Sequence, residues 1–373
     1  MKSNRFAVYV VVGVVFIALG ILAGLTVRVF PVQASAEAVQ VDSLFNFMLA
    51  IAVVVFLIVE GGIIYSILRF RRKKGDETDG LPIHGNTALE ITWTAIPAVI
   101  VFVLSIYSYA VYVDIRSPNE GELEVGVIGA QFQWSFTYPM PPDNDPAVTP
   151  ELREKIATYM IDSNLYLPVN RPIRAKIETK DVIHSFYIPE FRIKQDATPG
   201  RVTEAFFTPT LVGEWWVVCA ELCGVGHGNM SQINKVVVLE QAKYDEYIAN
   251  LYAKAKATAN DPTSPEVGKQ LVQQKYPCGA CHIISDAGLN ANKIGPSLNG
   301  IATRAGGHAA ANEGLVGGTD AKAYIRGSIV APNRYIVPGY QAGIMPQNYG
   351  NPNVMPPDDL EAIVNYLATL TQP

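Results

Sequence analysis

The chain has 373 residues, a hydrophobic fraction of 49% and a formal net charge of −5 at pH 7. A single hydrophobic core usually stops growing below this length, so we expect two or three domains. The negative charge and the lack of a basic patch interleaved with aromatic residues exclude nucleic acid as a partner.

Three long apolar segments lie in the first third of the chain, at residues 6–27, 44–68 and 91–113. Each is long enough to cross about 30 Å of hydrocarbon as a helix. We therefore predict a multidomain membrane protein that begins with transmembrane α-helices. Residues 37–115 are expected to form a transmembrane hairpin.

Residues 1–36 allow two interpretations. Basic residues precede the first apolar run, and Ala34-Ser35-Ala36 follows it as a pattern that a signal peptidase cuts. The apolar stretch is long for a signal peptide, however. This segment is therefore either a cleaved signal peptide or an additional transmembrane helix.

The distribution of Lys and Arg predicts the orientation in the membrane. Five of the six residues 69–74 are basic, whereas no Lys or Arg lies between Arg28 and Arg69. Because basic loops stay in the cytoplasm, we place the loop 69–88 there. Everything after Asp114 is then expected on the periplasmic or outer face of a bacterial cell membrane.

The rest of the chain contains regions with two different residue patterns, one typical of strands and one typical of helices. Short β-branched and aromatic runs separated by turn residues predict an antiparallel β-sandwich or barrel at 116–240. Residues 241–257 have apolar positions three and four apart, which predicts a helix within a linker at 241–263. Residues 264–373 have helical patterning at both ends and are expected to form a small all-α domain.

The segment CAELCGVGHGNM, residues 219–230, contains several potential metal ligands: Cys219, Cys223, His227 and Met230. Thiolate, imidazole and thioether donors together favour copper over Mg²⁺ or Ca²⁺. A blue-copper loop supplies one Cys, whereas two Cys suit the bridging of two metals. The further imidazole that such a site requires is offered by His184.

Two alternatives apply to the same segment. A disulfide between Cys219 and Cys223 would be allowed outside the cell. A zinc site is the second alternative, although zinc rarely takes a thioether such as that of Met230. Three glycines within the segment favour a loop wrapped around a ligand over a helix.

The sequence CGACH at residues 278–282 has the C-x-x-C-H pattern of covalent c-type haem attachment. Its two thiols, Cys278 and Cys281, would form thioethers, and His282 is placed to be the proximal iron ligand. Met345 and Met355, which both precede Pro, are candidates for the sixth ligand, with His308 as a rival. A Met ligand would raise the potential relative to bis-His ligation, which suits donation to copper.

Residues 37–240 resemble subunit II of haem-copper cytochrome c oxidase. The resemblance is carried by LEITWTAIPAVIVFVL, AQFQWSFTYP, DVIHSFYIPEFRIKQDATPGR and CAELCGVGHGNM. It implies a cupredoxin domain with a dinuclear, mixed-valence copper centre, CuA. The ligands that it implies are His184, Cys219, the backbone carbonyl of Glu221, Cys223, His227 and Met230. It also implies that the Glu221 side chain holds a non-redox Mg²⁺ shared with the catalytic subunit.

The C-terminal segment resembles a class I cytochrome c, so the whole chain is similar to the caa3-type fusion of subunit II with a cytochrome c domain. The resemblance implies that the carbonyl of Pro296 orients His282. It also favours Met345 over Met355 as the sixth haem ligand. Fusion replaces a diffusing donor by one at high effective concentration.

Three further residues are candidates on weaker grounds. Where mitochondrial relatives have a Trp that accepts electrons from soluble cytochrome c, this chain has Phe132 and retains Trp134. Trp134 is therefore a candidate for electron transfer, with core packing as the alternative. Glu90 matches the family position at the mouth of the K proton pathway, unless it only complements a helix dipole. Glu60 lies inside an apolar run, where it is functional or satisfied by a neighbouring subunit.

These patterns predict subunit II of a proton-pumping terminal oxidase. It would pass electrons from an external donor through haem c and CuA to the catalytic subunit, which reduces O₂. Expected partners are haem-copper oxidase subunit I, other oxidase subunits, membrane lipid, and a cytochrome c, a small copper protein or a quinol-oxidising complex as donor. The alternatives are a free electron-transfer or copper-delivery protein and a nitric oxide reductase subunit, but the membrane hairpin favours the oxidase.

Overall fold

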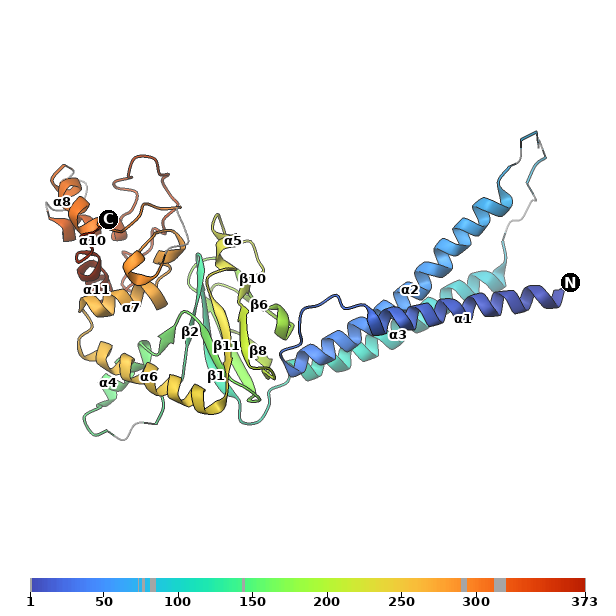
Figure 1. Ribbon diagram of the computed structural model, residues 1–373, viewed down its shortest axis with the longest axis horizontal. Helices are drawn as coiled ribbons and strands as arrows, with labels where there is room; N and C mark the ends of the chain where they lie inside the picture. Colours follow the sequence, from blue (N-terminus) through green and yellow to red (C-terminus); the bar gives the residue numbers. More distant parts are fainter. Residues whose placement is uncertain are drawn as a thin grey trace. The chain divides into compact units, whose positions relative to one another are not determined.

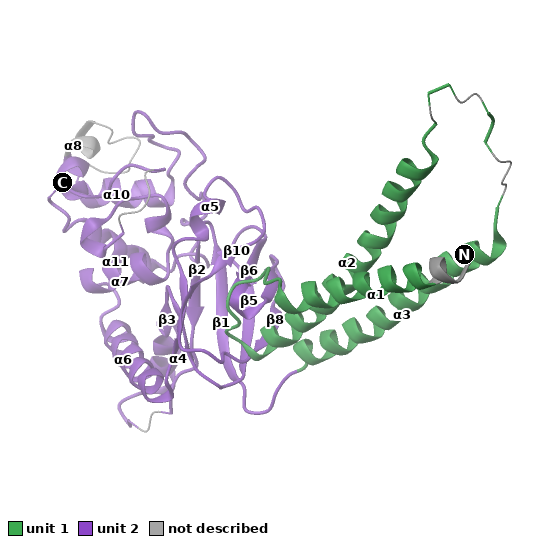
Figure 2. Cartoon of the chain, turned by 45° about the vertical axis from the view of Figure 1, so that its right-hand side comes forward, with its two compact units in different colours: residues 1–117 green, residues 118–373 purple. Residues whose placement is uncertain are grey.

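The computed structural model describes residues 2–372, except 73, 76–77, 81–84, 143–144, 290–293 and 312–319. The chain forms two compact units, residues 1–117 and residues 118–373 (Figure 2). The first unit is helical, and the second contains β-sheets followed by helices (Figure 1). This order confirms the predicted fold class of apolar N-terminal helices, a β-rich domain and a C-terminal helical domain.

Three helices of the first unit are long and apolar enough to cross a membrane. They are α1 (Lys2–Thr26), α2 (Ala36–Phe70) and α3 (Thr87–Arg116). Helix α2 begins where the side chain of Ser35 accepts a hydrogen bond from the backbone N–H of Ala38, and Asn86 caps α3 in the same way. The cytoplasmic side of the loop 69–88 stays a prediction, and part of this loop lies outside the described residues.

Glycines allow α1 and α2 to pack closely. A Cβ atom at Gly24 would lie 2.8 Å from the carbonyl oxygen of Asn46 in α2, and one at Gly20 would lie 2.6 Å from that of Ala50. Small residues of this kind let membrane helices approach each other through their backbones. Whether residues 1–36 are cleaved stays open as a prediction.

The β-rich part of the second unit contains one five-stranded sheet and two three-stranded sheets among the described residues. The sheet orders are β3-β2-β1-β5-β8, β10-β6-β7 and β4-β11-β9. The strands are β1 (Leu123–Ala130), β2 (Gln133–Thr137), β3 (Ile161–Asp162), β4 (Leu165–Pro168), β5 (Ile173–Thr179), β6 (His184–Ile188), β7 (Ile193–Ala197), β8 (Thr203–Phe207), β9 (Gly213–Trp216), β10 (Val218–Cys219) and β11 (Lys235–Leu239).

The expectation of purely antiparallel pairing was wrong for two strand pairs. β1 runs parallel to β5, with Val125 opposite Ala175, and β11 runs parallel to β4. Alternate residues of β1 and β5 are buried, as the sequence predicts. Such alternation identifies the buried face of a strand, but it does not encode the direction of the neighbouring strand.

One helix interrupts this β-rich part in sequence, and another follows it. Helix α4 (Pro150–Thr158) lies between β2 and β3 and was not predicted, although Thr149 caps it and Pro150 opens it. Helix α6 (Gln241–Asn260) occupies the segment where the apolar spacing predicts a helix. The domain boundaries themselves stay predictions.

The C-terminal helical part contains α7 (Pro265–Gln274), α8 (Ile301–Ala311), α10 (Ala321–Val330) and α11 (Pro357–Leu367). Helices α7 and α11, which come from opposite ends of this segment, pack together. Gly268 touches the backbone of Ala362 so closely that no Cβ would fit there. Val267, Leu271 and Ile363 are buried in the same core. Helix α11 also lines an apolar pocket, through Ile363 and Leu367.

Candidate metal and haem sites

Neighbouring strands bring the predicted copper ligands together. His184 begins β6, and β10 pairs antiparallel with β6 so that Cys219 lies opposite Phe186. After Cys219 the chain turns through a glycine-rich loop into the single-turn helix α5 (His227–Met230). The loop therefore folds back and returns His227 and Met230 to the place where Cys219 and His184 lie.

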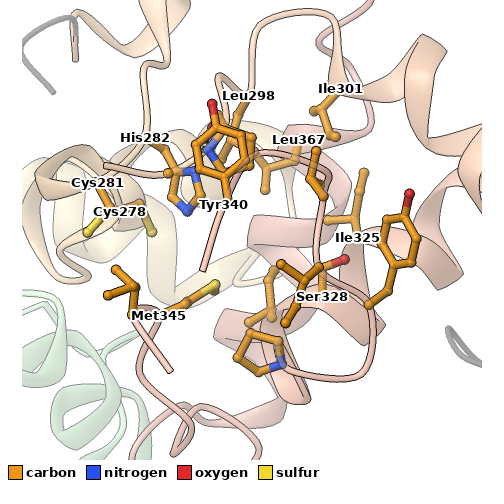
Figure 3. Close-up of a pocket in the computed structure, with 18 of the residues that line it drawn as sticks. Cys278, Cys281, His282, Leu298, Ile301, Ile325, Ser328, Tyr340, Met345 and Leu367 are labelled. Atoms are coloured by element: carbon orange, nitrogen blue, oxygen red, sulfur yellow. Dashed lines mark hydrogen bonds between the residues drawn. The ribbon is translucent and has the colours of Figure 1, made fainter. Parts of the chain in front are cut away.

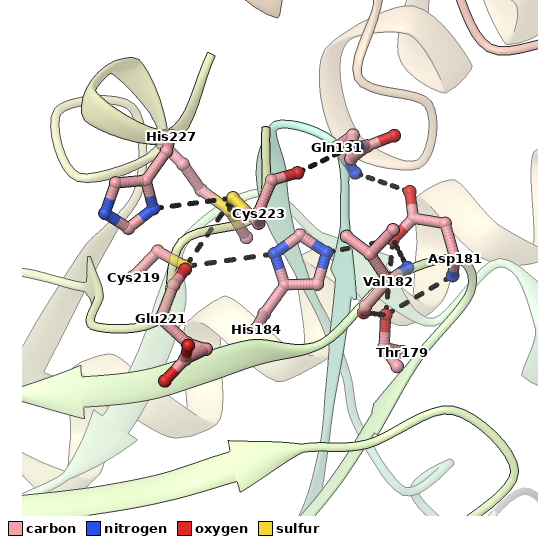
Figure 4. Close-up of polar contacts among 10 residues, drawn as sticks. Gln131, Thr179, Asp181, Val182, His184, Cys219, Glu221, Cys223 and His227 are labelled. Atoms are coloured by element: carbon pink, nitrogen blue, oxygen red, sulfur yellow. Dashed lines mark hydrogen bonds and ion pairs between the residues drawn. The ribbon is translucent and has the colours of Figure 1, made fainter. Parts of the chain in front are cut away.

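The sulfur and nitrogen atoms form one cluster (Figure 4). Sγ of Cys219 lies 3.8 Å from Nδ1 of His184 and 3.8 Å from Sγ of Cys223. Sγ of Cys223 lies 3.5 Å from Nδ1 of His227 and 3.9 Å from Sδ of Met230. The ligand atoms of His184, Cys219 and Cys223 are all within 4.8 Å of one another. These separations suit side chains that share a small bound centre.

The ligand atoms of this cluster distinguish between a disulfide, a zinc site and a copper site. Both cysteines are free, with sulfur atoms 3.8 Å apart, so they are not joined as a disulfide. The thioether of Met230 faces Cys223, which favours copper over zinc. A hydrogen bond between the two thiols lowers the pKa of Cys219 and raises that of Cys223.

The backbone carbonyl of Glu221 faces the sulfur and nitrogen cluster, whereas its side chain points away from it. Its carbonyl oxygen lies 3.2 Å from Sγ of Cys219, as expected for a ligand position. Its carboxylate is exposed and points away from the cluster (Figure 4). The residue can therefore serve the cluster and a site outside this chain at the same time.

Two glycines are required where the loop crosses the ring of Phe132. A Cβ atom at Gly226 would overlap this ring, and Gly224 has a φ of +128°, which favours glycine. Phe132 itself is only 4% exposed. Position 132, where the resemblance led us to compare Phe with an electron-accepting Trp, therefore holds a buried ring that supports the loop at 219–230.

A carboxylate that the sequence analysis did not identify orients His184. Oδ1 of Asp181 lies 2.9 Å from Nε2 of His184, and Oδ2 accepts a hydrogen bond from the backbone N–H of Gln131. Burial would raise the pKa of Asp181, but the hydrogen bonds outweigh it and leave the pKa lowered. Because the carboxylate accepts from Nε2–H, Nδ1 of His184 is free to bind a metal. Gln131 also donates to the carbonyl oxygen of Cys223 (2.6 Å).

Trp134 lies behind the same histidine. Its ring is fully buried and makes edge contacts with His184 (5.8 Å between centroids) and Phe186 (5.6 Å). Asn234 fixes the strand, because its side chain bonds both the N–H and the carbonyl of Trp134. Trp134 therefore packs against His184 in the interior, and its ring is not available for contact with a protein that docks on the surface. A role for it in electron transfer stays a proposal.

A second site lies in the C-terminal helical part, as a large apolar pocket (Figure 3). Cys278, Cys281 and His282 line it, together with Leu298, Ile325 and Leu367 from other segments. Most of the other side chains that line it are apolar, among them Ile301, Ile329 and Ile363. An apolar pocket with two cysteines and a histidine at its wall suits a covalently attached haem.

The pocket holds His282 in one orientation. Nδ1 of His282 lies 2.7 Å from the carbonyl oxygen of Pro296, where the resemblance places the orienting contact. Burial lowers the pKa of His282, so the ring is neutral, and Nδ1–H donates to this carbonyl. Nε2 is then free to bind iron. A Cβ at Gly295 would lie 2.7 Å from Cε1 of His282, so the ring requires glycine there.

The two candidate methionines have different surroundings. Met345 extends into the pocket from the wall that faces His282 (Figure 3). Met355 also lines the pocket but is buried at the start of the last helix. This arrangement favours Met345 as the sixth ligand. The side chain of His308, the rival, lies outside the described residues.

We expect Met345→Ala to remove low-spin Met ligation and to lower the haem potential, because a Met ligand raises this potential. Met355→Ala should retain the ligation and cost about 2–5 kcal/mol of stability, because it truncates a buried side chain. Absorption spectra of both oxidation states and a redox titration measure the difference. Loss of Met ligation in Met355→Ala alone would reverse the assignment.

The two membrane carboxylates do not belong to either site. Glu90 lies in the first turn of α3, where its carboxylate accepts a weak hydrogen bond from the N–H of Asn86 (3.4 Å). This is the contact of a helix-capping residue. Glu60 is half-buried within α2. Roles for them in proton transfer stay predictions.

Comparison with known proteins gives matches along nearly the whole chain. Residues 20–111 match the family model "Cytochrome C oxidase subunit II, transmembrane domain", residues 123–237 match "Cytochrome C oxidase subunit II, periplasmic domain", and residues 265–371 match "Cytochrome c". Cytochrome c oxidase subunit 2 of Synechocystis sp. is 34% identical over 323 residues, which cover 74% of this chain and 91% of that protein.

Further relatives have lower similarity. Cytochrome c oxidase subunit 2 of Alkalihalophilus pseudofirmus is 28% identical over 342 residues, 87% of this chain and 86% of that protein. Among solved structures, the periplasmic domain of subunit II of cytochrome oxidase of Bradyrhizobium japonicum is 29% identical. The alignment has a TM-score of 0.29 and covers 36% of this chain and 97% of that one.

Proposed function

Because the chain belongs to the cytochrome c oxidase subunit II family, we propose that it is the electron-accepting subunit of a proton-pumping terminal oxidase. In this proposal it relays electrons from an external donor through a covalent haem c to CuA. The catalytic subunit then receives the electrons and reduces O₂ to water. The observation that supports the relay is that one chain contains both a soft-donor cluster and an apolar pocket lined by the C-x-x-C-H motif.

We assign the copper centre to the cluster around the two cysteines. A dinuclear copper centre would supply one-electron chemistry there, bound by His184, Cys219, Cys223, His227, Met230 and the carbonyl of Glu221. The surrounding residues hold these ligand side chains in place. Asp181 fixes the tautomer of His184, and Phe132 supports the loop that carries Cys223 and His227. The exposed carboxylate of Glu221 is proposed to bind Mg²⁺ shared with the catalytic subunit.

We assign haem c to the pocket in the C-terminal helical part. Cys278 and Cys281 would hold it by thioethers, and His282 and Met345 would bind its iron. The carbonyl of Pro296 orients the histidine, and the apolar lining excludes water. A Met ligand raises the reduction potential of haem c. Exclusion of water lowers the reorganisation energy of each electron transfer.

Partners and location follow from the same proposal. The three apolar helices would anchor the chain among lipids and against subunit I, with the loop 69–88 in the cytoplasm and both cofactor domains on the outer face. The donor would be a cytochrome c, a small copper protein or a quinol-oxidising complex. Trp134 is a candidate for the electron path, and Glu90 for the proton path.

Spectroscopy of the full-length chain tests this function. We expect c-type haem absorption bands together with the near-infrared band and seven-line EPR spectrum of a mixed-valence copper pair. A four-line spectrum of a single copper would contradict the CuA assignment. Co-purification of a haem-containing catalytic subunit would separate an oxidase subunit from a free electron carrier, which would purify alone.

A further inference from the structure

The haem-binding part and the β-rich part both belong to the second unit, residues 118–373 (Figure 2), and a buried carboxylate joins them. Asp359, the third residue of α11, is only 1% exposed. Its Oδ2 accepts hydrogen bonds from Oη of Tyr276 and Nζ of Lys275, both at 2.7 Å. Its Oδ1 accepts one from Oη of Tyr159 at 3.2 Å. Tyr276 and Lys275 immediately precede the haem-attachment motif, whereas Tyr159 ends helix α4 of the β-rich part.

This cluster is shielded from water. The rings of Tyr159 and Tyr276 are buried, and the side chain of Lys275 is 22% exposed. The Lys275 ammonium also lies over both rings, 5.5 Å from the centre of Tyr159 and 5.7 Å from that of Tyr276. Hydrogen bonds and ion pairs are stronger away from water, and loss of one partner leaves a buried group unsatisfied. The contact therefore favours one arrangement of the two parts.

The cluster connects to the haem pocket. Tyr276 is two residues before Cys278, and its ring lies 6.1 Å from that of Tyr349, which lines the pocket. On the other side of the contact, Tyr159 belongs to the part that contains the proposed copper ligands. The hydrogen bond between Tyr159 and Asp359 therefore links the two cofactor-binding parts.

The connecting helix does not behave as a loose tether. The ring of Tyr247 in α6 stacks on that of Tyr166 in β4, with 4.1 Å between centroids. Its hydroxyl donates to Oδ2 of Asp162 at 3.1 Å. Leu251 and Ala255 of the same helix are buried. The linker is therefore packed along the β-rich part before the haem-binding part begins.

We propose that Asp359 and Tyr159 lock the haem-binding part onto the copper-binding part, so that electrons pass to copper without a search by a mobile domain. Both are positioning residues, since neither touches a cofactor. The inference rests on the proposed function. Each transfer oxidises ferrous haem by one electron and reduces the copper centre by one electron, with no bond formed and no proton moved.

Flash reduction of haem c in the intact oxidase tests this proposal. Haem oxidation and copper reduction are followed together by absorption, with and without sucrose as a viscogen. In the unmodified protein we expect a transfer rate that does not depend on viscosity. Asp359→Ala should slow transfer on the order of tenfold, because it removes the acceptor of the Tyr159 hydroxyl across the contact and leaves the buried partners Tyr276 and Lys275 unsatisfied. Tyr159→Phe should slow it less, and both variants should become viscosity-dependent.

Asp358→Ala is the matched control. Asp358 precedes Asp359 on the same helix and also pairs across the contact, with Lys155 at 3.6 Å, but its side chain is 54% exposed. Exposed pairs contribute little, so this variant should transfer electrons at the unmodified rate. Hydrogen exchange in the full-length chain gives a second readout: residues 150–159 and 275–281 should exchange faster in Tyr159→Phe and Asp359→Ala only.

Two different results would overturn the proposal: one rejects only the lock, and the other rejects the relay on which it rests. Unchanged, viscosity-independent transfer and unchanged exchange in Tyr159→Phe would reject the lock and leave the relay intact. Tyr159 lies outside the haem-binding part, so this variant answers the question even if Asp359→Ala fails to fold. If haem c in the unmodified oxidase never reduces copper, the proposed relay itself is wrong.

Discussion

Replacement of both Cys278 and Cys281 by alanine is expected to abolish covalent haem attachment and to unfold the C-terminal helical part. The apolar pocket would lose the group that fills it, and its lining would face water or an empty cavity. Small domains are stable by only about 5–15 kcal/mol, and a group bound to the folded state alone provides part of this. Haem staining after denaturing electrophoresis and hydrogen exchange of α7 and α11 measure the two effects.

Met345→Ala is the control for this experiment, because it removes an iron ligand and leaves both thioethers in place. It should retain the stained haem band. A haem band in the double cysteine variant would contradict covalent attachment at this motif. Native protection of α7 and α11 in the absence of haem would show that the helical part folds without its cofactor.

Local motifs made much of the two candidate sites predictable. The ligand spacing in residues 219–230 indicates a copper site, and the C-x-x-C-H sequence indicates haem attachment. Each motif lies within a few consecutive residues, so both sites can be identified without knowledge of the fold. The single-turn helix α5 at His227–Met230 is a refinement of the predicted loop. His184 was identifiable because a copper pair needs a second imidazole and few histidines were available.

The residues that support these sites could not be found in this way. Asp181 meets Gln131 across 50 positions, and Asn234 meets Trp134 across 100. Asp359 meets Tyr159 across 200 positions and reads in the sequence as an ordinary acidic residue at a helix start. Such contacts depend on how the strands and helices pack, which periodicity does not encode. Helix α4 differs, because Thr149-Pro150-Glu151 is a start signal that the sequence already contained.

The copper site leads to the second large expected effect. Cys219→Ser should remove the copper pair, because this sulfur lies 3.8 Å from both Sγ of Cys223 and Nδ1 of His184 and a serine hydroxyl lacks the soft thiolate donor that copper favours. Metal analysis should find at most one copper per chain, and the seven-line EPR spectrum should disappear. Haem c should remain reduced under turnover, since the electron has no acceptor. Oxygen consumption of the assembled oxidase should fall to the level of the copper-free enzyme.

Asp181→Ala is the graded comparison for Cys219→Ser, because it leaves every copper ligand in place and removes only the carboxylate behind His184. Loss of such a partner costs roughly 10–100-fold in metal affinity, so this variant should still bind two coppers when copper is in excess. It should release them to a chelator sooner than the unmodified chain. A seven-line spectrum in Cys219→Ser would mean that this sulfur is not a bridge, and the copper assignment would then fail.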